Sequence, residues 1–203
     1  MAIMKSLELL ISLGALTEEG VLSDPVGHQM VRLPLDPIYS KALIVASQFK
    51  CMEEMLIIVA MLSTESIYYT PREKLEESRA ASRSYSNSEG DHLTLLSIYR
   101  ASDELLEKSK LVSSREKAEK NLGKWCKDNF ISIRSLRNAR DIHSQIRRNV
   151  EQMGLGLSSC GGDMLLLRRC LAASFFINAA QKQPDGTYRA LSGGQTVQIH
   201  PSS

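Results

Sequence analysis

The segment that decides the fold reads SIRSLRNARDIHSQIRRNVEQM and spans residues 132–153. Its apolar residues recur at the spacing of one face of an α-helix, which advances about 100° per residue. On such a helix Leu136, Ala139, Ile142, Ile146, Val150 and Met153 fill an arc of about 120°. We therefore predict a helix with one face buried in a core.

The opposite face of this helix is dominated by arginine. An arc of about 140° holds Arg134, Arg137, Arg140, Arg147 and Arg148. In that arc Asp141 lies four residues after Arg137, and we expect local pairing to neutralise at most one or two of the charges. We expect three or more guanidinium groups to face outward. A solvated helix face is the alternative interpretation.

The composition is that of a globular protein with an organised charge distribution. The chain has 203 residues, of which 43% are hydrophobic and 24% charged, enough for one sizeable domain or two small ones. The net charge of +2 conceals a split, because residues 1–70 carry 4 basic and 8 acidic side chains and residues 131–182 carry 8 basic and 3 acidic. The basic part is therefore C-terminal.

The cysteines and the N-terminus indicate a soluble intracellular protein. Cys51, Cys126, Cys160 and Cys170 have neither CxxC nor metal-ligand spacing, and are interpreted as buried or half-buried thiols in a reducing compartment. Glu8 interrupts the moderately apolar N-terminal run, which argues against a signal peptide. No apolar run is long enough to cross a membrane.

The first third of the chain predicts a helix, a hairpin and two further helices. Residues 2–13 have helical periodicity, and residues 15–23 suit a small hairpin around a glycine turn, which together are typical of the end of a winged-helix unit. We expect the chain to begin inside a domain. Asp36 and Pro37 predict a helix start, with helices over 37–48 and 53–63, the second of them central to the core.

The rest of the chain predicts helices, a long loop and short strands besides the arginine helix. Residues 71–90 lack periodicity and are expected to form a long loop, after which Asp91 caps a helix over 92–107. The charged segment 108–123 is either an insertion or an exposed helical extension. A glycine-rich turn at 160–163 starts a helix to about Lys182, and short β-strands follow at 187–191 and 196–200. We expect the chain to end inside a larger β domain.

The sequence holds no recognisable active site. It has no GxxxxGK[ST] phosphate loop, no nucleophile elbow, no HExxH helix and no evident Ser-His-Asp set. We therefore predict no catalytic residue and no metal site in this chain.

Seven strings, in order, match one family. They are LPLDP at 33–37, IIVAMLS at 57–63, EGDHLTLL at 89–96, WC at 125–126 with Phe130, RSL at 134–136, FFINAA at 175–180 and HPSS at 200–203. Together they resemble the C-terminal region of DEAH-box RNA helicases of the pre-mRNA-splicing and ribosome-assembly type. The resemblance covers almost the whole chain.

The resemblance implies a mainly α fold with three parts. These are a winged-helix remnant at 1–36, a helical-bundle ratchet domain at 37–182 and the first strands of an OB-fold at 183–203. The RecA-like motor domains, which bind ATP and Mg²⁺ in the full-length family, are absent, so the chain alone is expected to lack ATPase activity and to hold no cofactor. The resemblance further implies a nuclear or nucleolar location, and as partners single-stranded RNA, the motor domains and an activating protein cofactor, with no membrane.

The resemblance also turns the arginine face into a candidate RNA surface. Arginine suits a channel for single-stranded RNA, because its planar fork bridges phosphate oxygens and its face stacks on bases. Phosphate contacts carry no sequence information, as a translocating motor requires. The candidates are Arg134, Arg137, Arg140, Arg147, Arg148, Arg168 and His200. The rival hypothesis is a protein-interaction module that docks the motor domains or a cofactor, with the arginines facing an acidic partner.

The remaining motif residues have structural interpretations beside functional ones. Gly90, Asp91 and His92 suit a turn, an N-cap and a first helical turn better than a catalytic site. Trp125 suits a core position better than a base-stacking platform. For His200 a loop near RNA and a strand-ending turn explain the sequence equally well. Of the adjacent Arg168 and Arg169, one can face the channel and the other a carboxylate.

Overall fold

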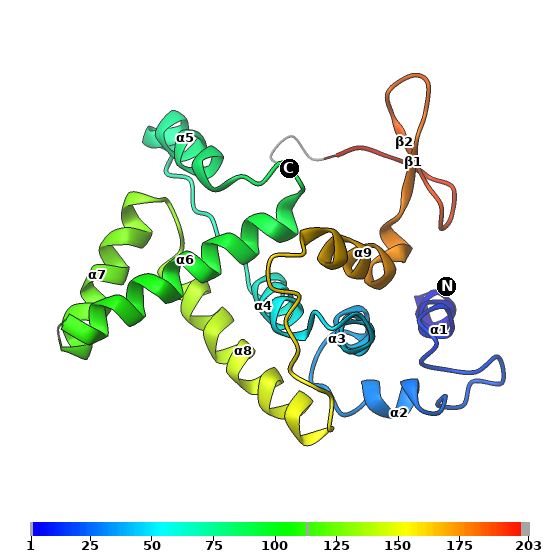
Figure 1. The fold of residues 1–203 in the computed structure, drawn as a ribbon. Helices are drawn as coiled ribbons and strands as arrows, with labels where there is room; N and C mark the ends of the chain where they lie inside the picture. The colour runs from blue at the N-terminus through cyan, green and yellow to red at the C-terminus, as the bar shows by residue number, and fades with distance from the viewer. Residues whose placement is uncertain (1, 113, 200–203) are drawn as a thin grey trace. The chain divides into compact units, whose positions relative to one another are not determined.

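The computed structural model describes residues 2–112 and 114–199, and these residues are mainly helical (Figure 1). The helices are α1 (Ala2–Ser12), α2 (Val26–Met30), α3 (Pro37–Phe49), α4 (Met52–Leu62), α5 (Leu75–Tyr85), α6 (Asp91–Val112), α7 (Arg115–Asp128), α8 (Ile133–Gln152) and α9 (Met164–Ser174). Two 3₁₀ turns cover Arg72–Lys74 and Phe176–Asn178. Strands β1 (Ala180–Lys182), β2 (Tyr188–Ala190) and β3 (Thr196–Val197) form an antiparallel sheet in the order β1-β2-β3. The predicted mainly α fold is confirmed.

The chain divides into two compact units, each considered by itself. One comprises Met1–Leu56 and Ile146–Ser203, and the other comprises Ile57–Gln145. Helices α4 and α8 each contribute residues to both units.

The N-terminal part of the first unit is a helix followed by a minimal hairpin, as predicted. Leu16 and Leu22 form an isolated antiparallel bridge, and the Thr17 amide donates to the Val21 carbonyl oxygen over 2.8 Å. Helix α2 approaches this hairpin closely at Gly27, where a Cβ atom would collide with the Ala15 carbonyl oxygen. Only glycine fits there without a shift of the backbone.

The predicted start of α3 is confirmed. The Asp36 carboxylate accepts a hydrogen bond of 2.9 Å from the Ile38 amide, and Pro37 occupies the first helical position. Helices α3 and α9 lie side by side (Figure 1), and Tyr39 meets Phe175 edge to face with ring centroids 6.4 Å apart. A small core of Leu13, Ala15, Met30 and Ile44 lies in the same unit.

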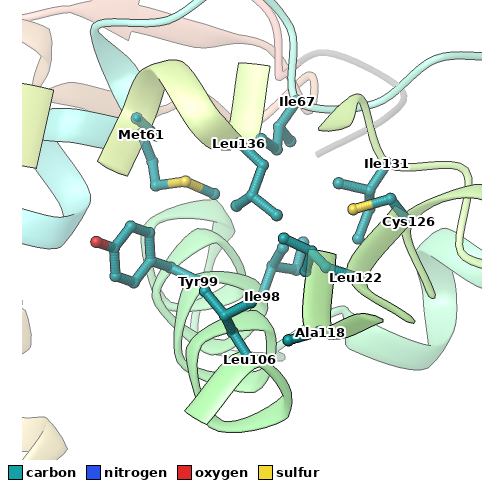
Figure 2. Packing of buried hydrophobic residues seen from close by; sticks show 11 residues of the cluster. Met61, Ile67, Ile98, Tyr99, Leu106, Ala118, Leu122, Cys126, Ile131 and Leu136 are labelled. Carbon is teal, nitrogen blue, oxygen red and sulfur yellow. The ribbon is translucent and has the colours of Figure 1, made fainter. Parts of the chain in front are cut away.

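The second unit is built around a larger apolar core (Figure 2). Its members come from α4, α6, α7, α8 and the segments that join them: Met61, Ile67, Ile98, Tyr99, Leu106, Ala118, Leu122, Cys126, Ile131, Leu136 and Ala139. Helices α6 and α7 pack along each other (Figure 1). The charged segment 108–123 is therefore the end of α6 and most of α7, which agrees with a helical extension.

The expected loop at 71–90 is wrong, because α5 occupies much of it. This helix buries only the small side chain of Ser78 along its length and has exposed ion pairs, such as that of Arg79 with Glu76 at 3.0 Å. A helix without a stripe of large apolar residues leaves no periodic signal. Tyr85 at its end packs on the core and meets Trp125 edge to face, with centroids 5.8 Å apart.

The expected helix from 163 to about Lys182 is too long. The Asp163 carboxylate caps α9 by accepting from the Leu166 amide over 2.9 Å, as predicted for a helix start, but α9 ends at Ser174. After a 3₁₀ turn, β1 pairs with β2 so that Ala180 faces Ala190. Strand pairing is a non-local interaction, which the apolar run at 170–180 does not reveal.

Candidate functional site

Helix α8 is fixed at both ends by local geometry. At its start the Ser132 amide donates to the Ile67 carbonyl oxygen over 2.8 Å, and the Ser132 hydroxyl accepts from the Ser135 amide over 3.2 Å. At its end Gly154 has a φ of +74°, the left-handed conformation that stops a helix. The predicted apolar face is confirmed: Leu136, Ala139, Ile146 and Val150 are all buried.

Carboxylates engage Arg137, Arg140 and Arg147 of α8. Arg137 pairs with Glu119 of α7 at 2.7 Å. Arg140 pairs with Asp103 of α6 at 3.0 Å and donates to Ser102 over 3.2 Å.

Arg147, in the first unit, makes the third of these pairings. It contacts Glu53 of α4 at 2.6 Å and Glu151 of its own helix at 3.4 Å. The exposure of Arg134, Arg137 and Arg148 agrees with the expectation that at least three guanidinium groups face outward, although Arg137 is paired with a carboxylate. Glu53, Glu119 and Asp103 come from other helices, so the local spacing rule could not count them.

The other predicted arginines lie on the surface. Arg134 is exposed and forms no ion pair with any residue in the described part of the chain. Arg148 of α8 and Arg168 of α9 are also exposed, as is Arg169. His200, the remaining candidate, lies outside the described residues.

A polar groove of about 740 Å³ lies in the second unit, between α6, α7 and α8. Four basic and two acidic side chains line it: Lys110, Arg115, Arg137, Arg140, Glu119 and Asp141. The predicted residues Arg137 and Arg140 thus meet two basic residues that the sequence analysis did not single out, Lys110 and Arg115. Both residues lie in the charged segment 108–123. If that segment is interpreted as helical, its sequence predicts that they line a surface beside the arginine helix.

The first unit contains a buried carboxylate with a structural role. Glu54 is fully buried, and its carboxylate accepts from the Ser159 hydroxyl over 2.6 Å and from the Cys160 amide over 3.1 Å. Burial acts to raise the pKa of Glu54, but these hydrogen bonds outweigh it and the pKa is lowered. The carboxylate is thereby kept ionised and holds the 158–160 segment against α4.

The cysteines are not placed for thiolate chemistry. All four are free, and burial is the main cause that raises the pKa of Cys51, Cys126 and Cys170 to about 11 and that of Cys160 to about 12. The thiols therefore stay protonated near neutral pH. In the described part of the chain no group of three or more His, Cys, Asp or Glu side chains is arranged to hold a metal ion.

The other motif residues occupy the positions expected of structural groups. Gly90 has a φ of +118°, and Asp91 is the first residue of α6. Burial lowers the pKa of His92, which therefore favours its neutral form. Trp125 packs against the core of the second unit, in agreement with its interpretation as a core residue. Among the described residues, none of the helices has the length and apolar character that would let it span a membrane.

Comparison with known proteins identifies the region. Residues 6–35 match the family model "Helicase associated domain (HA2), winged-helix", and residues 36–95 match "Helicase associated domain (HA2), ratchet-like". The chain is 61% identical over 202 residues to the pre-mRNA-splicing factor ATP-dependent RNA helicase DEAH10 of Arabidopsis thaliana, covering 100% of this chain and 28% of that protein.

Two animal helicases are also similar. The chain is 39% identical over 193 residues to the ATP-dependent RNA helicase DHX33 of Drosophila melanogaster (95% of this chain, 26% of that protein). It is 36% identical over 196 residues to the human DHX33 (94% of this chain, 25% of that protein). The chain spans about a quarter of the length of the curated relatives it matches. It belongs to the helicase-associated (HA2) region of the DEAH-box RNA helicases.

Proposed function

We propose that this region binds single-stranded RNA without sequence specificity, beside RecA-like motor domains that supply ATP hydrolysis. The observation that carries the proposal is the exposure of Arg134, Arg148 and Arg168 in a region whose relatives are named RNA helicases. Guanidinium groups at a surface form bidentate contacts with phosphate oxygens. Such contacts do not depend on the base, so each of them accepts a strand in any register.

The ion pairs rank the predicted arginines. Arg137, Arg140 and Arg147 each contact a carboxylate, which compensates part of the positive charge that an RNA phosphate would meet. Arg134 has no such carboxylate among the described residues. We therefore assign a main RNA contact to Arg134 in the second unit. In the first unit we assign main contacts to Arg148 and Arg168 because their side chains are exposed, and we assign secondary contacts to Arg137, Arg140 and Arg147.

The remaining features of the proposal follow from the family. We propose a winged-helix remnant at 1–36, a ratchet domain at 37–182 and the start of an OB-fold at 183–203. Nucleotide and Mg²⁺ belong to the motor domains, and this region binds neither. A nuclear location is supported by the name of the Arabidopsis relative, a pre-mRNA-splicing factor.

The experiment that tests the RNA proposal is a charge reversal with a matched control. Fluorescence anisotropy with labelled oligouridylate is measured for the wild-type chain, for the triple variant R134E/R148E/R168E and for K117E/K124E/K127E. The control also reverses three exposed basic residues, all on α7. We expect the first variant to lose at least tenfold in affinity and the control to lose much less. Equal losses would indicate a general charge effect, and no binding by the wild-type chain at low salt would reject the proposal.

A further inference from the structure

The groove between α6, α7 and α8 is a preformed charged surface. Its two arginines on α8 are oriented by ion pairs, Arg137 by Glu119 and Arg140 by Asp103. The Arg140 side chain is only 15% exposed, and its Nε atom is buried without a hydrogen-bond partner among the described residues. Fixed guanidinium groups lose little conformational entropy when they bind an anion.

Within the described part of the chain, the groove has unpaired charges of both signs, whereas an RNA channel needs unpaired positive charge. Lys110 is paired with Glu107 at 2.6 Å, so three of the four basic residues have a carboxylate partner. Arg115, at the positive N-terminal end of the 14-residue α7, forms no ion pair within the described residues. Asp141, on the same groove, also forms none there. Arg115 therefore offers a positive charge, and Asp141 a negative one.

These features favour a peptide over an RNA strand. An RNA strand carries a phosphate at every nucleotide, and some of those phosphates would lie near the Asp141 and Glu119 carboxylates. Among the described residues that line the groove, none has an aromatic side chain on which a base could stack, but Leu106 is apolar. A peptide can place acidic side chains at the cations and an apolar side chain at Leu106. It need not place a negative charge near Asp141. The volume of about 740 Å³ is in the range of ligand-binding clefts.

We propose that the groove formed by Lys110, Arg115, Arg137 and Arg140 binds an acidic peptide segment of a protein partner. This interaction can be tested separately from the main proposed RNA contacts, because Lys110 and Arg115 line the groove and Arg134, Arg148 and Arg168 do not. The groove lies on helices that extend past residue 95, where the match to the ratchet-like family model ends.

The test uses two probes on the full 203-residue chain, and each variant should weaken the binding of only one of them. The peptide probe is a short fluorescein-labelled peptide of alternating Glu and Leu, with a Lys-Leu peptide as its control, and the RNA probe is labelled oligouridylate. The groove variant is K110Q/R115Q. Its matched control is K117Q/K124Q, which removes two exposed charges from α7 outside the groove lining. Unfolding in urea checks that each variant is folded.

We expect the wild-type chain to bind the Glu-Leu peptide and not the Lys-Leu peptide. K110Q/R115Q should weaken that binding about five- to tenfold, as expected for two partly exposed ion pairs, and leave RNA binding unchanged. R134E/R148E/R168E should weaken RNA binding and leave binding of the Glu-Leu peptide unchanged. Binding of RNA but not of the Glu-Leu peptide, equal effects of the groove and control variants, or loss of RNA binding in K110Q/R115Q would overturn this inference. Peptide binding without RNA binding would overturn the proposed function alone.

Discussion

Glu54 shows how one residue ties distant segments together. Its carboxylate is fully buried on α4 and accepts from the Ser159 hydroxyl and the Cys160 amide, about a hundred residues later in the chain. Both donors are satisfied by a charged acceptor, and hydrogen bonds to charged groups contribute more than neutral ones. Neither the apolar pattern of α4 nor the glycine-rich turn at 160–163 predicts this pairing, because it depends on the tertiary fold.

We predict that E54A destabilises the chain by about 2 to 3 kcal/mol at pH 7, because both donors lose their charged acceptor. The pKa of Glu54 is lowered in the folded state, so its ionisation stabilises the fold above its ordinary pKa of 4.5, and this contribution is lost as the pH falls through the folded-state value. The difference between wild type and E54Q should therefore shrink as the pH is lowered below about 4.5. Urea unfolding at several pH values measures this difference in the free energy of unfolding.

E116Q is the matched control for this prediction. Glu116 has an exposed side chain that pairs with Lys120 at 3.1 Å on the surface of α7. Such pairs contribute at most about 1 kcal/mol, and often nothing measurable. A destabilisation of E54A no larger than that of E116Q would show that the buried carboxylate does not hold the 158–160 segment.

Among the elements, α8 was the most predictable from sequence. Its apolar arc is a local property at a regular spacing, and the buried residues of the helix fall within that arc. The carboxylates that engage its arginines were not predictable in the same way, because they lie on α4, α6 and α7. Helix α5 was missed for another reason, since a helix that buries a serine does not produce an apolar stripe.

We predict that the core contribution of α8 is large and can be isolated with two leucines. Leu136 is 0% exposed and belongs to the core of the second unit, whereas Leu111, near the end of α6, is 86% exposed. L136A should lower the free energy of unfolding by about 2 to 5 kcal/mol, because it leaves a cavity. L111A removes the same atoms from a solvated site and should change it by less than about 0.5 kcal/mol.

Both variants are measured by urea unfolding with the fluorescence of Trp125, the only tryptophan of the chain. Because Trp125 packs on the core that contains Leu136, its emission reports on the unit in question. Similar unfolding midpoints for L136A and L111A would mean that the apolar face of α8 is not packed as described.

The whole molecule combines an acidic N-terminal part with a basic C-terminal part, and the fold redistributes these charges. Glu53, from the acidic part, compensates Arg147 from the basic part at 2.6 Å. The sequence-based count of basic residues therefore overestimates the charge that remains for a ligand. The number of phosphates that the exposed arginines engage determines how strongly RNA binding depends on salt.

We predict a moderate salt dependence for oligouridylate binding. If Arg134, Arg148 and Arg168 each hold one phosphate, the slope of log K against log salt concentration should be about −2, from a coefficient of about 0.7 per phosphate for single strands. R134Q removes one contact and should reduce the slope by about 0.7. R79Q is the matched control, because Arg79 is an exposed arginine that pairs with Glu76 on α5 and is not one of the proposed RNA contacts. A slope near zero, or the same change in R79Q as in R134Q, would show that these arginines do not act as individual phosphate contacts.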